Sequence, residues 1–431
     1  MIKKLTYILK MMAGVVCTML AISACNEKGI EVIDPEWDKP ADNTLLMYLV
    51  GDNSLSSLLE GNVRDAQAAI RDSVQAGTLN LVVMKDNDKS NDSKPVLYWV
   101  HGTRELRLDT VMIKRWEKDE NTASADFLSE AIELTFSRFN TSIKGLSLGS
   151  HSSGWLPATN SKNAKPRRNA FGCDETPSPI AYLDTWDLGA ALRKGPKLNY
   201  ILMDCCHMAL AEIAYELKDC ADYMVGCPSE EEGAGLPYRK IITALSRCKS
   251  ANDLPKTLDY CSKCYFDEYA RTSYGATIAF FDLRQMDELG NAYKALLDSN
   301  SDRLKRYAEA DGEQVVTWVK NFQQYGREEG GLHYSFCFYD ILSVIDWLGA
   351  TDAANATRAR NAVLKAVVSK YSTDSYRGIK VWNYSGMAVS IPEVFHLAKK
   401  GSGYASYFAP YDDEKLLTGY HKTAWGSSMG Y

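Results

Sequence analysis

One cysteine and one histidine have the surroundings that a cysteine nucleophile and its base require. Cys206 follows the apolar run 198–203, and His151 follows the apolar run 143–148 in a loop rich in Gly and Ser. Cysteine catalysis requires a thiolate, and a nearby imidazole can take the thiol proton and later return it. Cys206 and His151 are therefore a candidate catalytic pair.

The expected local structure favours this chemistry. A helix predicted to begin just after Cys206 would lower the pKa of the thiol through its N-terminus. Small residues around His151 leave room for a substrate backbone, and their amides can form an oxyanion hole. Simpler explanations remain, because a cysteine at a strand end often serves packing and a histidine in a Ser-rich loop is often solvated.

Buried strands and amphipathic helices are predicted to position the pair. Continuous apolar runs predict strands over 44–50, 79–84, 143–148 and 198–203. Helical spacing of apolar residues follows in 127–139 and 210–217. This alternation favours an α/β fold with a mainly parallel central sheet covered on both faces. Loops at the carboxyl ends of such strands carry the reactive groups, so the sheet can bring Cys206 and His151 together.

Several short motifs around the pair occur in a characteristic order. The segment 203–208 reads Met-Asp-Cys-Cys-His-Met, and the loop 149–155 reads Gly-Ser-His-Ser-Ser-Gly-Trp. Further matching segments are 221–223, 229–231 and 235–238. Together they resemble the clostripain family of cysteine peptidases, whose motifs usually read Asp-Ala-Cys-Leu-Met and His-Gly-x-Gly-Trp. The resemblance is good over 45–283 and looser beyond.

The resemblance implies a caspase-like α/β/α sandwich and peptide-bond hydrolysis by a Cys–His dyad. Cys206 matches the nucleophile and His151 the base, and the amides of Ser152 and Cys206 match the oxyanion hole. Asp204 matches an acid of the primary specificity pocket, where its carboxylate would bind Arg or Lys. Capping of the following helix is the alternative role for Asp204.

Two departures from the family pattern concern the nucleophile. Cys205 replaces the usual Ala and is a second candidate nucleophile, although the spacing from Asp204 to Met208 favours Cys206. His207 replaces a typical Leu and is expected to point away from the neighbouring thiol.

A third departure concerns specificity. Ala234 stands where family members often carry a second acid, which weakens the expected preference for Arg or Lys. A glutamate of the run 230–232 could compensate, or the run could form a solvated loop.

Self-cleavage is a further expectation, because family members are often zymogens cut between the histidine and the cysteine. The stretch 160–170 lies there and is polar and basic, as a nicked loop should be. We expect cleavage after Arg168, or else after Arg167. An uncut solvated loop is the alternative.

The N-terminus is typical of an exported lipoprotein. A basic start precedes the apolar run 11–24, which ends in Ile-Ser-Ala before Cys25. This ending resembles a bacterial lipobox, so Cys25 is the predicted lipidation site and the anchor to the cell envelope, at the outer membrane or surface. An ordinary signal peptide followed by a chance cysteine is the alternative.

The chain is expected to contain four parts. These are a signal peptide (1–24), a tether (25–43), a caspase-like peptidase domain (44–285) and a C-terminal helical extension packed on that domain (286–431). A late strand pair is expected near 379–391 within the extension.

Composition excludes several other classes. The 431 residues carry a net charge of −6, which argues against a nucleic-acid partner, and 45% are hydrophobic, which argues against disorder. No phosphate-binding glycine loop is present, and we expect no required cofactor. The clusters 52–53 and 86–88 could bind calcium, although strand-end turns explain them equally well.

These observations together predict an envelope-anchored cysteine endopeptidase of peptide and protein substrates. It would form a thioester intermediate and cut after Arg or Lys. The competing hypothesis is a weak or inactive peptidase-like lipoprotein that binds peptides or a partner protein.

Overall fold

The computed structural model describes most of the chain after residue 40. The described ranges are 41–72, 79–87, 94–102, 108–157, 171–176, 180–309, 321–325, 327–329, 332–334, 338–393, 395 and 413–431. Pro40–Tyr431 form one compact unit. The predicted lipidation site Cys25 and the predicted cleavage site Arg168 lie outside the described residues. Within the described ranges, no helix is both long enough and apolar enough to cross a membrane.

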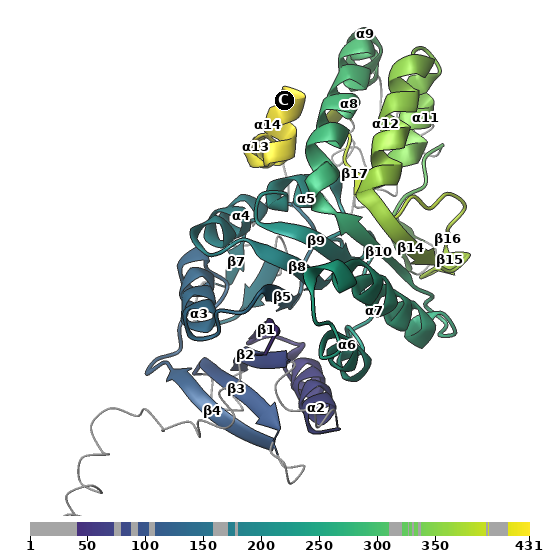
Figure 1. The fold of residues 1–431 in the computed structure, drawn as a ribbon. Coiled ribbons are helices and arrows are strands. Elements are labelled where there is room, and N and C mark those ends of the chain that lie inside the picture. The colour runs from purple at the N-terminus through teal and green to yellow at the C-terminus, as the bar shows by residue number, and fades with distance from the viewer. Residues whose placement is uncertain are drawn as a thin grey trace, which may run out of the picture. The chain divides into compact units, whose positions relative to one another are not determined.

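A mixed sheet of nine strands lies at the centre of the described residues (Figure 1). Its five central strands run parallel in the order β9, β8, β5, β1, β2. They are β9 (Ala221–Gly226), β8 (Leu198–Asp204), β5 (Ile143–Gly149), β1 (Asn43–Gly51) and β2 (Leu79–Asn87). The predicted α/β fold with a mainly parallel central sheet is confirmed.

Antiparallel strands flank this parallel centre at both edges. One edge carries β10 (Thr277–Asp282) and β14 (Val367–Ser372), and the other carries β3 (Val96–Gly102) and β4 (Leu108–Arg115). The reactive loops at the sheet centre are therefore supported by paired strands on both sides.

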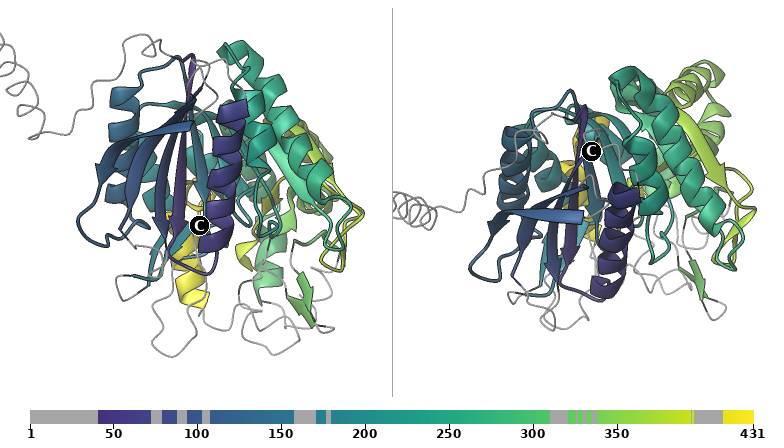
Figure 2. Two further views of the ribbon diagram at one scale, coloured as in Figure 1. Left: turned by 90° about the horizontal axis from the view of Figure 1, so that it is seen from below. Right: turned by 60° about the horizontal axis from the view of Figure 1, so that its bottom comes forward.

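Helices cover both faces of the sheet, as Figure 2 shows. One face carries α2 (Ser56–Asp72), α6 (Tyr238–Leu245) and α7 (Leu254–Tyr269); the other carries α3 (Ala125–Arg138), α4 (Thr185–Lys194) and α5 (Ala211–Leu217). Alternation along β1 explains why both are needed. Met47 belongs to the core under α2, α6 and α7, whereas the ring of Tyr48 contacts Phe127 of α3.

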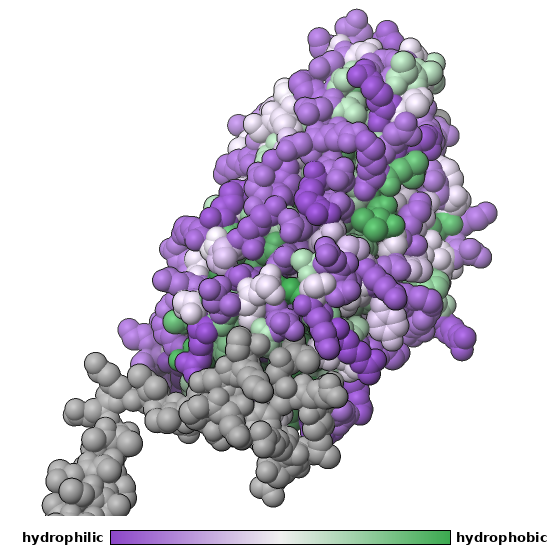
Figure 3. All heavy atoms as spheres, in the orientation of Figure 1, coloured by the Kyte–Doolittle hydropathy of each residue, from purple (hydrophilic) through white to green (hydrophobic). Residues whose placement is uncertain are grey.

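The chain after β10 is mainly helical and packs against the end of the sheet near α5. Its helices are α8 (Met286–Ser299), α9 (Ser301–Glu309), α11 (Ile341–Gly349), α12 (Ala353–Ala366), α13 (Asp413–Lys422) and α14 (Ala424–Met429). Two carboxylates of α5 hold it: Ser390 N donates to Glu212 (2.8 Å) and Ala424 N donates to Glu216 (2.9 Å). The face shown in Figure 3 is mostly hydrophilic, as expected when apolar side chains fill the layers beside the sheet.

The strand pair expected near 379–391 is wrong in its pairing. The two short strands there pair elsewhere: β16 (Ile379–Lys380) with β15 (Ser375–Tyr376), and β17 (Ala388–Val389) with β13 (Tyr339–Asp340). Only two residues separate β15 from β16, so the two strands pair as a tight hairpin.

Candidate active site

The register of the sheet brings the two candidate catalytic loops together. Strands β5 and β8 are neighbours, and Gly149 pairs with Asp204 at their carboxyl ends. His151 and Cys206 each lie two residues beyond that pair. Figure 1 shows β5 and β8 side by side in the sheet centre. Both loops therefore lie at the carboxyl ends of neighbouring central strands, as predicted.

Direct contacts join these loops. Ser152 Oγ donates to Met208 Sδ at 3.0 Å. Gly154 adopts φ +69°, and a Cβ there would lie 3.0 Å from the carbonyl oxygen of His207. The glycine thus permits a backbone approach that a side chain would block. Ser152, predicted to supply an oxyanion amide, lies beside the segment that follows Cys206.

The Cys206 thiol is bound by one backbone amide. Its side chain is partly exposed, and Glu231 N donates to Sγ at 3.3 Å. Burial of the sulfur and the nearby Glu230 carboxylate raise the pKa of the thiol to about 12, while the Glu231 amide and Arg377 act in the opposite direction. Cys206 is therefore a thiol in this arrangement and needs a base to become a nucleophile.

Cys205, the alternative nucleophile, is fully packed. Its side chain is 2% exposed, and burial raises the pKa of its thiol well above the ordinary value. It belongs to the core rather than to the accessible edge of the sheet.

The helix predicted directly after Cys206 is absent from this position. Helix α5 begins at Ala211, and Leu210 is its N-cap residue. His207 interrupts the chain with φ +57°, its Nδ1 lies 3.0 Å from the carbonyl oxygen of Pro228, and its ring faces Phe338. The prediction that a helix N-terminus lowers the pKa of Cys206 is therefore wrong. The alternative role of Asp204 as the cap of that helix is wrong for the same reason.

His151 is held by the loop that follows β1. Its Nε2 atom lies 3.0 Å from Ser54 Oγ, and its side chain is buried. Its carbonyl oxygen accepts from Gly172 N at 3.0 Å, which fastens the loop to β6 (Phe171–Asp174). A solvated role for this histidine is therefore wrong. The sequence analysis missed Ser54, although its place after a strand end was an available signal.

Asp204 lies beneath the site in a dense set of hydrogen bonds. Its carboxylate accepts from Leu236 N (2.7 Å), Tyr238 Oη (2.8 Å) and Asn62 Nδ2 (3.3 Å). Burial raises its pKa to about 6, and these donors oppose the rise. Gly235 makes this arrangement possible, because a Cβ at its φ of +71° would lie 2.4 Å from Asp204 Oδ1.

The glutamate run 230–232 is part of the site rather than a solvated loop. Glu231 is 6% exposed, and neither of its carboxylate oxygens has a hydrogen-bond partner. Burial and the charge of Asp204 raise its pKa well above the ordinary value. Glu230 forms an ion pair with Arg377, with 3.2 Å between Oε2 and Nε. Ala234 is exposed.

The predicted calcium clusters lie at the carboxyl ends of the neighbouring strands β1 and β2. Asp52 and Asp86 are buried together with Asp174, and Thr122 Oγ1 lies 2.7 Å from Asp86 and 3.1 Å from Asp174. Burial and neighbouring acids raise the pKa of Asp86 to about 9, and burial raises that of Asp174 to about 7. Across the described ranges, no group of three or more His, Cys, Asp or Glu side chains has the arrangement of a metal site. Asp88 lies outside those ranges.

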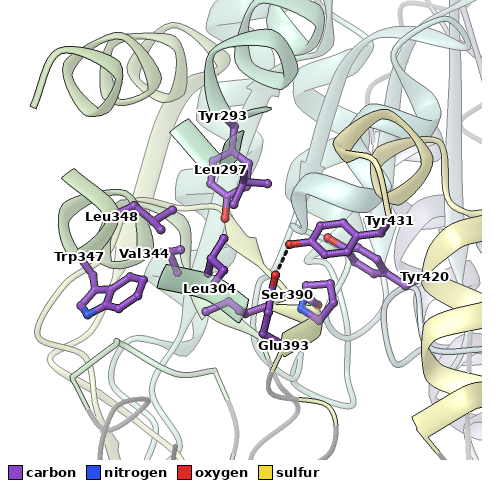
Figure 4. Close-up of a pocket in the computed structure, with 12 residues that line it drawn as sticks. Tyr293, Leu297, Leu304, Val344, Trp347, Leu348, Ser390, Glu393, Tyr420 and Tyr431 are labelled. Atoms are coloured by element: carbon purple, nitrogen blue, oxygen red, sulfur yellow. Dashed lines mark hydrogen bonds between the residues drawn. The ribbon is translucent and has the colours of Figure 1, made fainter. Parts of the chain in front are cut away.

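A pocket in the C-terminal part is separate from these residues (Figure 4). Its walls come from α8, α9, α11 and the end of the chain, including Tyr293, Trp347 and Tyr420. Tyr431 Oη donates to Glu393 Oε1 at 2.6 Å across it. None of the predicted site residues lines this pocket.

Comparison with known proteins agrees with the fold and with the motifs. A family model described as the clostripain family matches residues 47–431. A secreted C11 cysteine protease from Bacteroides thetaiotaomicron, solved with an irreversible peptide inhibitor, is 21% identical with a TM-score of 0.67, covering 90% of this chain and 99% of its own. An inactive zymogen C11 protease from Parabacteroides distasonis is 22% identical with a TM-score of 0.68, covering 92% and 99%.

No curated protein matches the sequence. The two solved structures show the fold, whereas the family match extends over nearly all of the compact unit. The chain therefore belongs to the clostripain family of cysteine peptidases.

Proposed function

We propose that this peptidase acts through Cys206 and His151 and forms a thioester on Cys206. The observation that carries the proposal is the register of β5 and β8, which sets both residues two positions beyond one pair of strand ends. The partly exposed thiol of Cys206 and the Ser54 hydroxyl at His151 also support it. A thiol whose pKa is raised to about 12 needs a base at close range.

The reaction divides into two proton-balanced steps. His151 takes the Cys206 proton, the sulfur attacks the peptide carbonyl carbon, and the amides of Ser152 and Cys206 bind the oxyanion. The leaving amine receives the proton from His151 as the carbon–nitrogen bond breaks. Water then gives its proton to His151 and attacks the thioester, which releases the acid and restores the thiol. Oxyanion stabilisation by fixed amides is expected to contribute most to the rate.

We further propose a preference for Arg or Lys before the cleaved bond, with Glu231 in place of the acid absent at Ala234. Asp204 already accepts three hydrogen bonds of good geometry, whereas the Glu231 carboxylate accepts none and has only the backbone amide of Cys205 to oppose the rise in its pKa. A cation beside two buried acids would remove the electrostatic cost that raises their pKa values. A charge-assisted hydrogen bond to Glu231 would contribute about 1.5–3 kcal/mol.

A mixed peptide library tests both proposals. Wild-type protein should cut mainly after Arg and Lys, whereas Cys206→Ala should not cut and Cys205→Ala should retain activity. Glu231→Gln should lower the preference for Arg over norleucine by about tenfold, since one charge-assisted bond is lost. Cleavage by Cys206→Ala would refute the nucleophile. Absence of cleavage by wild type, with reductant present, would favour the peptide-binding lipoprotein instead.

The remaining proposals concern export and calcium. Cys25 is proposed as the lipidated residue of an exported, envelope-anchored protein. Metabolic labelling with palmitate should then mark wild type but not Cys25→Ser, and Cys17→Ser, which changes the other cysteine of the N-terminal apolar run, should be labelled like wild type. The dyad itself requires no metal, so activity should survive chelation by EGTA. Loss of activity that calcium restores would instead assign the ion a necessary role.

A further inference from the structure

A short hairpin near the site carries an arginine in an unusual backbone conformation. Tyr376 of β15 pairs with Ile379 of β16, which leaves Arg377 and Gly378 as a two-residue turn. Their φ angles are +43° and +82°, as a type I′ turn requires. Asn-Gly is the preferred sequence for this turn, and the conformation is sterically unfavourable for most L-residues that carry a Cβ. Arg377 therefore occupies a backbone conformation that disfavours most residues with a side chain.

The arginine side chain is fixed by polar and aromatic contacts. Arg377 Nε lies 3.2 Å from Glu230 Oε2 and 3.1 Å from Tyr376 Oη. Its guanidinium lies 4.8 Å from the centre of the Tyr274 ring, and its backbone amide donates to the carbonyl oxygen of Tyr274 at 2.8 Å. Its side chain is 27% exposed and that of Glu230 is 13% exposed. The ion pair is therefore largely removed from solvent screening.

This ion pair adjoins the nucleophile. The peptide unit that links Glu230 to Glu231 carries the amide bound to Cys206 Sγ at 3.3 Å. The Glu230 carboxylate disfavours the thiolate, and the Arg377 guanidinium favours it. Pairing the two groups neutralises the carboxylate and fixes the peptide unit that contacts the sulfur.

We propose that Arg377 is a positioning residue for Cys206. By pairing with Glu230 it offsets the negative charge beside the thiol and holds the Glu231 amide against Sγ, so that Cys206 gives up its proton more readily. This inference rests on the proposed role of Cys206 as the nucleophile. The strained turn is then explained, because an arginine at the hairpin tip reaches Glu230 with its guanidinium.

Other ionisable groups also surround the sulfur and must be held constant in a test. They are Glu230, Glu231, Cys205, Cys227, Tyr376, the neighbouring His207 and the proposed base His151. Arg377 is the group among those described around Cys206 that favours the thiolate by its positive charge.

The test measures the iodoacetamide alkylation rate of Cys206 in the full chain as a function of pH, with the labelled residue identified by peptide mass spectrometry. The variants are Arg377→Asn, Arg377→Lys, Glu230→Gln and the double variant Arg377→Asn/Glu230→Gln. Asn suits the positive φ, so the turn should tolerate Arg377→Asn although the ion pair is lost, and a melting curve checks that the variant folds. Arg360→Asn is the matched control, because Arg360 pairs with Asp346 in the C-terminal helices.

Arg377→Asn should raise the apparent pKa of Cys206 and slow alkylation about threefold or more below that pKa. A rise of one unit slows the reaction only about three- to fourfold, since the thiolate fraction falls tenfold while thiolate nucleophilicity increases. Arg377→Lys should retain most of the rate, and Glu230→Gln should increase it. The effect of Arg377→Asn should be smaller in the Glu230→Gln background, because the two residues act as a pair.

Three results would overturn the inference. Alkylation by Arg377→Asn at the wild-type rate would show that the ion pair has no influence on the thiol. Faster alkylation would show that Arg377 shields the site instead. Equal effects of Arg377→Asn with and without Glu230 would exclude action through the pair. Labelling of Cys205 in place of Cys206 in wild type would refute the proposed nucleophile itself, a separate outcome that the mass spectrum identifies.

Discussion

Replacement of Asp86 by Asn should stabilise the protein relative to wild type, and this gain in the free energy of unfolding should grow as the pH rises from 5 to 7. Asp86 is 1% exposed, accepts from Thr122, and adjoins Asp52 and Asp174. Burial and these acids raise the pKa of Asp86 from 3.8 to about 9. Asn keeps the shape and an acceptor oxygen but carries no charge at any pH.

The sign follows from proton linkage. The folded protein keeps a proton on Asp86 that the unfolded chain releases above pH 3.8. The wild-type free energy of unfolding therefore falls as pH rises between the two pKa values, by about 1.4 kcal/mol per pH unit. Asp86→Asn removes this loss, so its advantage over wild type should grow by about 3 kcal/mol from pH 5 to pH 7. Asp174 contributes its own proton in both proteins.

Urea unfolding of both proteins at pH 5, 6 and 7 measures this difference. The exposed β4 residue Asp109 supplies the control, and Asp109→Asn should track wild type across the range. The slope does not depend on how well Asn fits, because any packing penalty is the same at each pH. A difference between Asp86→Asn and wild type that stays constant from pH 5 to pH 7 would mean that Asp86 is ionised in the folded protein, and the reasoning would be refuted.

Three further changes probe the site. Gly235→Ala should destabilise the protein by about 1–3 kcal/mol in urea unfolding, because its Cβ would lie 2.4 Å from Asp204 Oδ1 at φ +71°; an unchanged midpoint would contradict this. Ser54→Ala should lower kcat about tenfold with little change in KM, since His151 loses the hydroxyl that orients it; a change in KM alone would exclude that role. Ala234→Asp should increase kcat/KM for Arg peptides over norleucine peptides about tenfold, because it restores a second carboxylate for the bound cation; an unchanged ratio would contradict the placement of this residue at the specificity pocket.

The sequence predicts those parts of the fold that depend on local apolar patterning. The runs that became β1, β2, β5 and β8 are almost wholly buried, so continuous hydrophobicity identified them. Strand β14 was not predicted, because α12 ends at Ala366 and the strand begins at Val367 without an intervening turn signal. Its position is set by pairing with β10, a contact far away in sequence.

The site shows the same division between local and distant determinants. Cys206, His151 and Asp204 follow predicted strands, so their common location could be inferred from topology. The helix expected after Cys206 was wrong, because the segment before α5 pairs its backbone with a neighbouring loop. Arg377 gave no signal in the sequence, since only the folded hairpin brings it to Glu230.

The loop after β9 explains how two consecutive glutamates, Glu230 and Glu231, acquire different environments. His207 N donates to the carbonyl oxygen of Ser229 (2.9 Å), and Ala209 N donates to that of Cys227 (3.0 Å). These bonds fasten the loop across the segment that carries the nucleophile, so its side chains cannot all turn toward solvent. Glu230 is paired, whereas the neighbouring Glu231 is buried without a hydrogen-bond partner. Burial and the charge of Asp204 disfavour ionisation of Glu231, so the chain holds a buried acid beside its candidate nucleophile whose charged form is costly. If the proposed preference for Arg or Lys holds, a cationic substrate side chain would favour ionisation of Glu231 as it binds, which would couple substrate recognition to the charge of this acid.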